Sequence, residues 1–296
     1  MENLASTQAE ADTRIVLHAT HSASFPRTIV RCDDTDVLVL LLHYQSGGML
    51  SREVYMHAGH AGKITTKERF IPVTKIAEEV GPLLCSILPA MHALSGCDTT
   101  SGFFKIGKRT AFNALQKHQD ELKGLSEFNS PGPEVGMDSA RKFGILIYKG
   151  RKDRLCKTLD ELRLIHSSTT DKPVVSLPPT EDAFQQHALR AKYQTMVWCS
   201  SHIAKPEVGD PCAYGWTKSG ENLVCIRTLK ESAPSDLRNL THLYCQDSSC
   251  IDGAKCPCLQ VGLPCIEACK CSDCPNTVRV EQDNGDGDGD GRSDEN

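Results

Sequence analysis

The sequence has little of what would place the protein in a membrane or outside the cell. No apolar run approaches the roughly 18 residues of a membrane-spanning helix. The polar N-terminal stretch lacks the basic-then-apolar pattern of a signal peptide. The formal net charge is −5, which is not the balance of a protein that coats DNA nonspecifically. We therefore expect a nuclear or cytoplasmic protein that is not secreted and has no membrane partner.

Composition indicates a folded protein that binds metal. With 296 residues the chain has room for one large or two to three small domains, and 39% hydrophobic residues permit a core. It contains 15 cysteines, eight of them within 30 residues. In a reducing compartment such a density indicates metal ligands rather than disulfides.

Two acidic pairs stand near the beginning of the chain, Glu10 with Asp12 and Asp34 with Asp36. The second pair follows the short β-branched run 28–32, which predicts a buried strand of a parallel sheet. Ligands of open α/β sheets bind beyond the carboxyl ends of the strands. Convergent carboxylates are what Mg²⁺ prefers. Taken singly, each pair is also explained by capping of the helix that follows it.

A third acid, Asp98, follows the apolar helix predicted for residues 83–94 and precedes a glycine-containing turn with a basic helix start. Such a turn offers backbone N–H groups to a phosphate without reading base sequence. His92, within the apolar helix, is better explained as a core histidine than as a ligand. The candidate phosphate-contacting residues are Gly102, Lys105, Gly107, Lys108 and Arg109.

The order of these motifs, EAD, then DTD about twenty residues on, then GCD with a Gly-x-Lys-Arg turn, resembles the second half of a flap-endonuclease-type domain of the PIN-like superfamily. The resemblance covers roughly residues 8–120. It implies a Rossmann-like parallel sheet with helices and a catalytic Mg²⁺ or Mn²⁺ site. It also implies that residues 99–118 grip duplex DNA. The residues that match the metal-binding carboxylates are Glu10, Asp12, Asp34, Asp36 and Asp98.

The sequence departs from that family at its start. The family's domain begins with a central strand that carries another metal-binding Asp, whereas only MENLASTQA precedes the EAD motif here. We expect a partial sheet whose missing strands a partner protein could supply, and little or no nuclease activity from this chain. The alternative is an active divalent-metal nuclease once those strands are present.

The cysteine-rich stretch 245–276 is too poor in apolar side chains to bury a core of its own. Zinc coordination would hold it together instead, and metal binding would drive its folding. The pattern resembles the tesmin-type CXC domain, which implies shared zinc ions and DNA binding. That family has nine cysteines per repeat, and His242 is a candidate substitute for the missing ligand. The predicted zinc ligands are Cys245, Cys250, Cys256, Cys258, Cys265, Cys269, Cys271 and Cys274.

These observations predict an α/β protein with five segments. They are a partial PIN-like domain (1–125), a helical segment (126–204), a turn-rich connector (205–244), the CXC-type module (245–276) and a disordered acidic tail (277–296). The pairing of a PIN-like domain with a CXC-type module resembles that of transposon-like invertebrate proteins. This resemblance implies mobile-element origin and binding of DNA rather than RNA. The module carries three basic side chains against four acidic ones between His242 and Arg279, so a scaffold for protein partners is the alternative.

Overall fold

The computed structural model describes residues 4–59, 68–148, 150, 156–169 and 173–230, together with the single residues 258, 265 and 276. The chain divides into two compact units, 1–229 and 230–296. Within the described ranges, no helix combines the length and the apolar character needed to cross a membrane.

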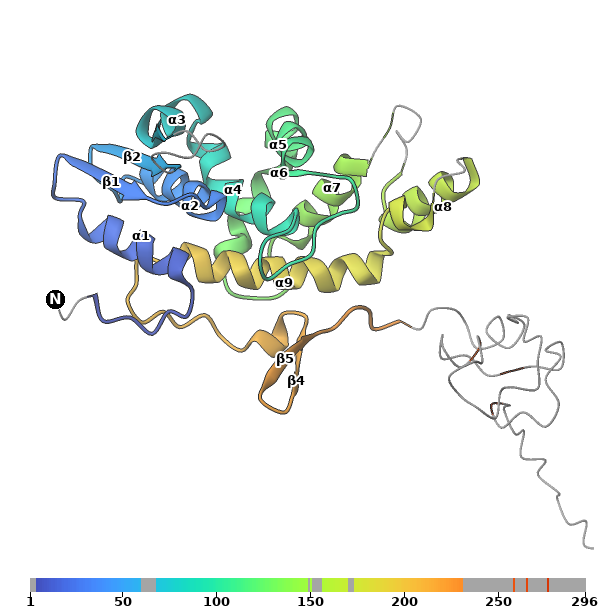
Figure 1. Ribbon diagram of the computed structural model, residues 1–296. Coiled ribbons are helices and arrows are strands. Elements are labelled where there is room, and N and C mark those ends of the chain that lie inside the picture. Colours follow the sequence, from blue (N-terminus) through green and yellow to red (C-terminus); the bar gives the residue numbers. More distant parts are fainter. Residues whose placement is uncertain are drawn as a thin grey trace, which may run out of the picture. The chain divides into compact units, whose positions relative to one another are not determined.

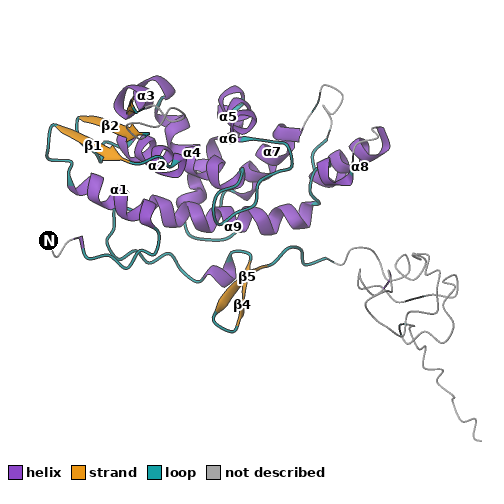
Figure 2. Ribbon diagram, viewed as in Figure 1, coloured by secondary structure: helices purple, strands orange, loops and turns teal. Residues whose placement is uncertain are grey.

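The first unit is mixed α/β, with a small sheet at one end of a helical body (Figures 1 and 2). Its elements in chain order are α1 (Ala11–His21), β1 (Arg27–Arg31), α2 (Thr35–Ser46), β2 (Glu53–Ala58), β3 (Arg69–Pro72), α3 (Val73–Val80), α4 (Pro82–Leu94), α5 (Lys108–Lys117), α6 (Gln119–Leu122), the 3-10 helix η2 (Lys123–Asn129), α7 (Met137–Tyr148), α8 (Leu159–Thr169), η3 (Val174–Ser176), α9 (Glu181–Cys199), η4 (Pro211–Ala213), β4 (Trp216–Ser219) and β5 (Asn222–Cys225).

The main sheet has the order β1-β2-β3, with β1 parallel to β2 and β3 antiparallel to β2. The expectation of a parallel sheet is therefore wrong for β3. The ten residues between β2 and β3 are fewer than a parallel crossover needs. Only one face of the sheet is packed, since Val30 and Met56 are buried while Ile29 and Phe70 are 55% and 57% exposed.

The distribution of buried apolar residues shows which helices lie in the middle of the core. In α2, residues on nearly every side are buried, including Val37, Leu40 and Leu41, as expected for a helix enclosed by α1, α3 and α4. The longest helix, α9, packs along α4, α7 and η2. Thr180 caps α9, because its Oγ1 accepts the N–H of Ala183.

Two of the predicted segment boundaries do not separate compact units. Residues 126–204 pack into the same unit as residues 1–125, and the hydrophobic anchors Leu125 and Phe128 lie in the common core. The connector predicted for 205–244 contains the β4-β5 hairpin, which turns at Gly220 with a positive φ of 62°. The predicted tail and most of the CXC-type module lie outside the described residues.

Candidate metal centre

The start of α1 presents two carboxylates to the centre of the unit. Glu10 is the extended N-cap residue, and Asp12 lies in the first turn, where the helix dipole favours negative charge. Both oxygens of Glu10 accept hydrogen bonds from α9. Gln194 Nε2 lies 2.9 and 3.1 Å from Oε1 and Oε2, and Trp198 Nε1 lies 3.1 Å from Oε2. These neutral donors position Glu10 without cancelling its charge.

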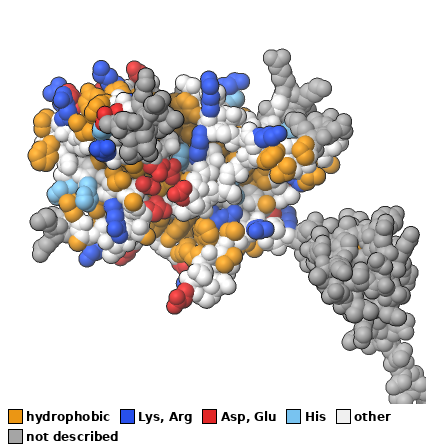
Figure 3. Space-filling view, in the orientation of Figure 1, with side chains coloured by type: hydrophobic (Ala, Val, Ile, Leu, Met, Phe, Trp, Pro, Cys, Tyr) orange, Lys and Arg blue, Asp and Glu red, His pale blue; other side chains and the backbone are white. Residues whose placement is uncertain are grey.

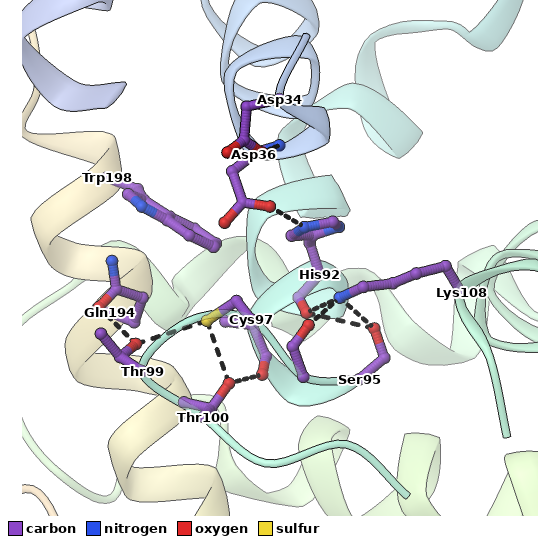
Figure 4. A network of polar contacts seen from close by, with 12 residues as sticks. Asp34, Asp36, His92, Ser95, Cys97, Thr99, Thr100, Lys108, Gln194 and Trp198 are labelled. Carbon is purple, nitrogen blue, oxygen red and sulfur yellow. Dashed lines mark hydrogen bonds and ion pairs between the residues drawn. The ribbon is translucent and has the colours of Figure 1, made fainter. Parts of the chain in front are cut away.

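The turn between β1 and α2 contributes the second pair. Asp34 caps α2, with its Oδ1 accepting the N–H of Asp36 at 2.9 Å. The Oδ1 atom of Asp36 lies 2.7 Å from Nε2 of His92, a buried residue of α4 (Figure 4). The expected helix cap is therefore present, and the same turn aims Asp36 at α4.

Asp98 lies in a tight loop that follows α4. Gly96 has a φ of 105°, and a Cβ placed there would lie 2.7 Å from Cα of Gly102, so the loop closes on itself only with glycine. Thr99 Oγ1 donates to Oε1 of Gln194 at 2.7 Å (Figure 4). One amide of α9 thus bonds to the loop that carries Asp98 and also to the start of α1.

The other four predicted carboxylates lie near enough to Asp12 for their charges to act on it. The pKa of Asp12 is raised from 3.8 to about 6, chiefly by burial, and the charges of Asp34, Asp36, Glu10 and Asp98 add to the shift. Figure 3 shows acidic side chains gathered on the face where α1, α2 and α9 come together in Figure 1. Among the described residues, no Lys or Arg forms an ion pair with any of these five.

The donor set fits a hard divalent cation that keeps much of its water. In the described part of the chain, no three His, Cys, Asp or Glu side chains are yet placed to ligate one ion. Charges act over longer distances than the roughly 2 Å of direct coordination, so the carboxylates can repel one another without sharing a ligand position. Mg²⁺ is commonly bound through one or two carboxylates plus waters. Carboxylates that have no Lys or Arg partner among the described residues suit such an ion.

The predicted phosphate-contacting residues divide into two groups. Gly107 is the N-cap of α5, and Lys105 and Arg109 on either side of it are exposed. Gly102 is exposed in the Asp98 loop. Lys108 differs, because its ammonium turns inward.

Burial lowers the pKa of Lys108 to about 8, against the opposing effects of Cys97 and Asp36. Its Nζ donates to the carbonyl oxygens of His92 and Gly96 and to Ser95 Oγ (Figure 4). Lys108 therefore ties the end of α4 to the start of α5, and the influence of Asp36 shows that this corner adjoins the carboxylates.

The residues that hold the carboxylates in place were not predicted from the sequence. His92 is buried as expected, but it also bonds to Asp36. Gln194 and Trp198 come from α9, within the segment 126–204 that was predicted only to be helical. Their spacing of four residues places them on one side of α9, which was the available signal. Nothing local to the sequence indicates that this side meets Glu10.

Only two of the predicted zinc ligands lie among the described residues. Cys258 and Cys265 are both buried. The N–H of Cys265 donates to the Asn276 carbonyl at 2.6 Å, and Asn276 Nδ2 lies 3.6 Å from the Cys265 sulfur. The other six cysteines and His242 lie outside the described residues.

Replacing Asp12 with Asn should change how stability depends on pH. The folded state holds the Asp12 proton more tightly than the unfolded state, so the contribution of Asp12 to wild-type stability should fall as pH rises from about 4 to about 6. The variant lacks this loss, and its free energy of unfolding should exceed that of the wild type at neutral pH. Urea denaturation of both proteins across this range measures the difference. A matched change at exposed Asp120 is the control, and a difference that does not vary with pH contradicts the assignment.

Comparison of the chain with protein-family models, with curated proteins and with solved structures gives no match. The geometry of the carboxylates and the sequence motifs are therefore the basis for inferring a function.

Proposed function

We propose that the first unit binds Mg²⁺ or Mn²⁺ through its carboxylate cluster and binds nucleic acid, DNA rather than RNA, beside it. The observation that supports this most directly is the gathering of acidic side chains around Asp12, with Gln194 and Trp198 holding Glu10 and His92 holding Asp36. A divalent cation would relieve their mutual repulsion. The resemblance to flap-endonuclease-type domains gives the same residues the same role.

The surroundings of the cluster supply room and charge for a polynucleotide. A cavity of about 490 Å³ adjoins Glu10 and is lined also by Thr99, Gln194 and the aromatic side chains Tyr193 and Trp216. On the α5 side, exposed Lys105 and Arg109 flank the helix start, where backbone N–H groups and the dipole favour phosphate. A backbone phosphate contacted there would lie beside the carboxylate cluster.

The carboxylates and the side chains that hydrogen-bond to them have separate roles in this proposal. A bound divalent ion would supply neutralisation of phosphate charge and polarisation of its oxygens. Asp12, Asp34 and Asp98 would hold it, directly or through water. Gln194 orients Glu10 through two hydrogen bonds to its carboxylate, and His92 orients Asp36. These partners restrict the carboxylates to one arrangement and so favour a single ion position.

The cysteine-rich stretch adds a zinc module to this proposal. We propose that the cysteines from Cys245 to Cys274 bind zinc and that the module targets the first unit to DNA or to a protein partner. Its support is the spacing of the cysteines and the lack of apolar side chains for a core.

Titration of the zinc-loaded protein with Mn²⁺, followed by the electron paramagnetic resonance signal of free Mn²⁺, should show about one bound ion. A single ion is expected, because among the described residues no three of these side chains are placed to share one ion, and an ion of this kind is commonly held by one or two carboxylates plus waters. Asp34→Ala should remove most of the binding, and Gln194→Leu should weaken it about tenfold, as for other residues that orient ligands. Asp120→Asn is the control. Unchanged affinity in both site variants contradicts the proposal.

Reversing the exposed charges beside α5 should weaken DNA binding. Lys105→Glu combined with Arg109→Glu should lower affinity for a flap-bearing duplex in Mg²⁺ and reduce the slope of affinity against salt by about two, one for each lost phosphate contact. Fluorescence anisotropy at several salt concentrations gives both quantities. The same reversal at Lys117, exposed at the other end of α5, should change neither.

Cleavage is measured in the same samples with flap, nicked and single-stranded substrates. We expect little or none, because in-line phosphodiester hydrolysis uses two ions about 4 Å apart. Robust cutting that Asp34→Ala abolishes would show instead that the carboxylates of this chain suffice for catalysis.

Elemental analysis of protein purified under reducing conditions should find at least about two zinc ions per chain. Eight thiolates fill two tetrahedral sites without sharing. Substituting Cys250 and Cys256 with Ser should lower the zinc content, whereas the same change at Cys212, in the first unit, should not. A folded module free of zinc would refute the assignment.

A further inference from the structure

The outer edge of β1 presents backbone groups that no strand of the described residues pairs with. In the sheet β1 adjoins only β2. The carbonyl of Pro26 and the N–H of Cys32 bond to β2, each at 3.1 Å. Successive residues of a strand point their backbone N–H and C=O groups to opposite edges, so these groups of Thr28 and Val30 point toward β2 as well. The N–H and C=O groups of Arg27, Ile29 and Arg31 therefore point to the open edge.

A groove runs along this edge between β1 and α1. Its volume is about 610 Å³, and its apolar lining includes Ile15 and Ala19 of α1 together with Ile29 and Val30 of β1. Ile29 is 55% exposed in the middle of the strand. Natural proteins usually shorten, charge or cover an apolar strand edge, so an open one with a groove beside it is suited to an added strand.

The charge of the groove indicates what kind of strand fits. Its lining includes Arg14, Arg31 and His18 and contains no Asp or Glu. A second copy of β1 would bring further arginines to the same place, and like charges directly opposite each other destabilise a strand pair. An acidic segment would instead complement the groove.

We propose that the edge of β1 receives an extended segment of a partner protein in which aliphatic and acidic side chains alternate. The segment adds as a strand beside β1, with main-chain hydrogen bonds to Arg27, Ile29 and Arg31. Its aliphatic side chains fill the groove against Ile15, and its carboxylates lie near Arg31. This interaction requires neither metal nor nucleic acid, so its test is independent of the proposed function.

The test uses the full chain and two fluorescent seven-residue peptides, one alternating valine with glutamate and one alternating valine with lysine. Fluorescence anisotropy should show saturable binding of the glutamate peptide alone. Arg31→Glu should weaken that binding roughly fivefold, as expected for an exposed ion pair, and should allow the lysine peptide to bind. Lys117→Glu is the charge-matched control and should behave as the wild type.

Ile29→Pro tests the strand pairing itself. The N–H of Ile29 points away from β2, so proline there removes an edge donor and leaves the β1-β2 ladder intact. Binding should be lost while the melting temperature stays close to that of the wild type. The proposal is overturned if the glutamate peptide does not bind, or if it binds Ile29→Pro equally. It is also overturned if sedimentation shows a wild-type dimer that Ile29→Pro dissociates, since a second copy would then occupy the edge.

Discussion

The hydrogen bonds that hold Glu10 against α9 and Asp36 against α4 are the interactions on which the carboxylate cluster around Asp12 depends. Side chains of like charge separate unless packing holds them, and burial makes the repulsion stronger. Three separate elements deliver these acids, namely α1, the β1-α2 turn and the loop after α4. Gln194 and Trp198 donate hydrogen bonds to Glu10, and His92 Nε2 lies 2.7 Å from Asp36 Oδ1. No Lys or Arg of the described residues pairs with these carboxylates.

Helix α9 is the element that keeps these parts together. Gln194 bonds to both Glu10 and Thr99, and Trp198 bonds to Glu10 through its indole nitrogen. The Trp198 carbonyl in turn accepts the hydroxyl of Tyr44 from α2 at 3.0 Å. A helix almost two hundred residues after Glu10 in the chain therefore determines where Glu10 lies. Function and core packing share the same residues here, so a change at Gln194 or Trp198 acts on both.

Local pattern predicted the elements near the carboxylates well. The β-branched run ending in acids gave strand β1 and the start of α2, and the apolar run 83–94 forms most of α4. Local pattern failed where distant parts meet. The polar stretch after Leu125 suggested a boundary, yet Leu125 and Phe128 are buried in the common core. The burial of the Lys108 ammonium could not be predicted from local sequence either, because its three oxygen partners lie at the end of another helix.

We propose that the carboxylates around Asp12 form a divalent-cation site. Crystals of the protein soaked in Mn²⁺ and measured at the manganese absorption edge test it most directly. An anomalous difference peak should lie among Asp12, Asp34 and Asp98, and it should be absent from crystals of Asp34→Ala treated alike. A well-occupied peak elsewhere with none between these side chains would contradict the account.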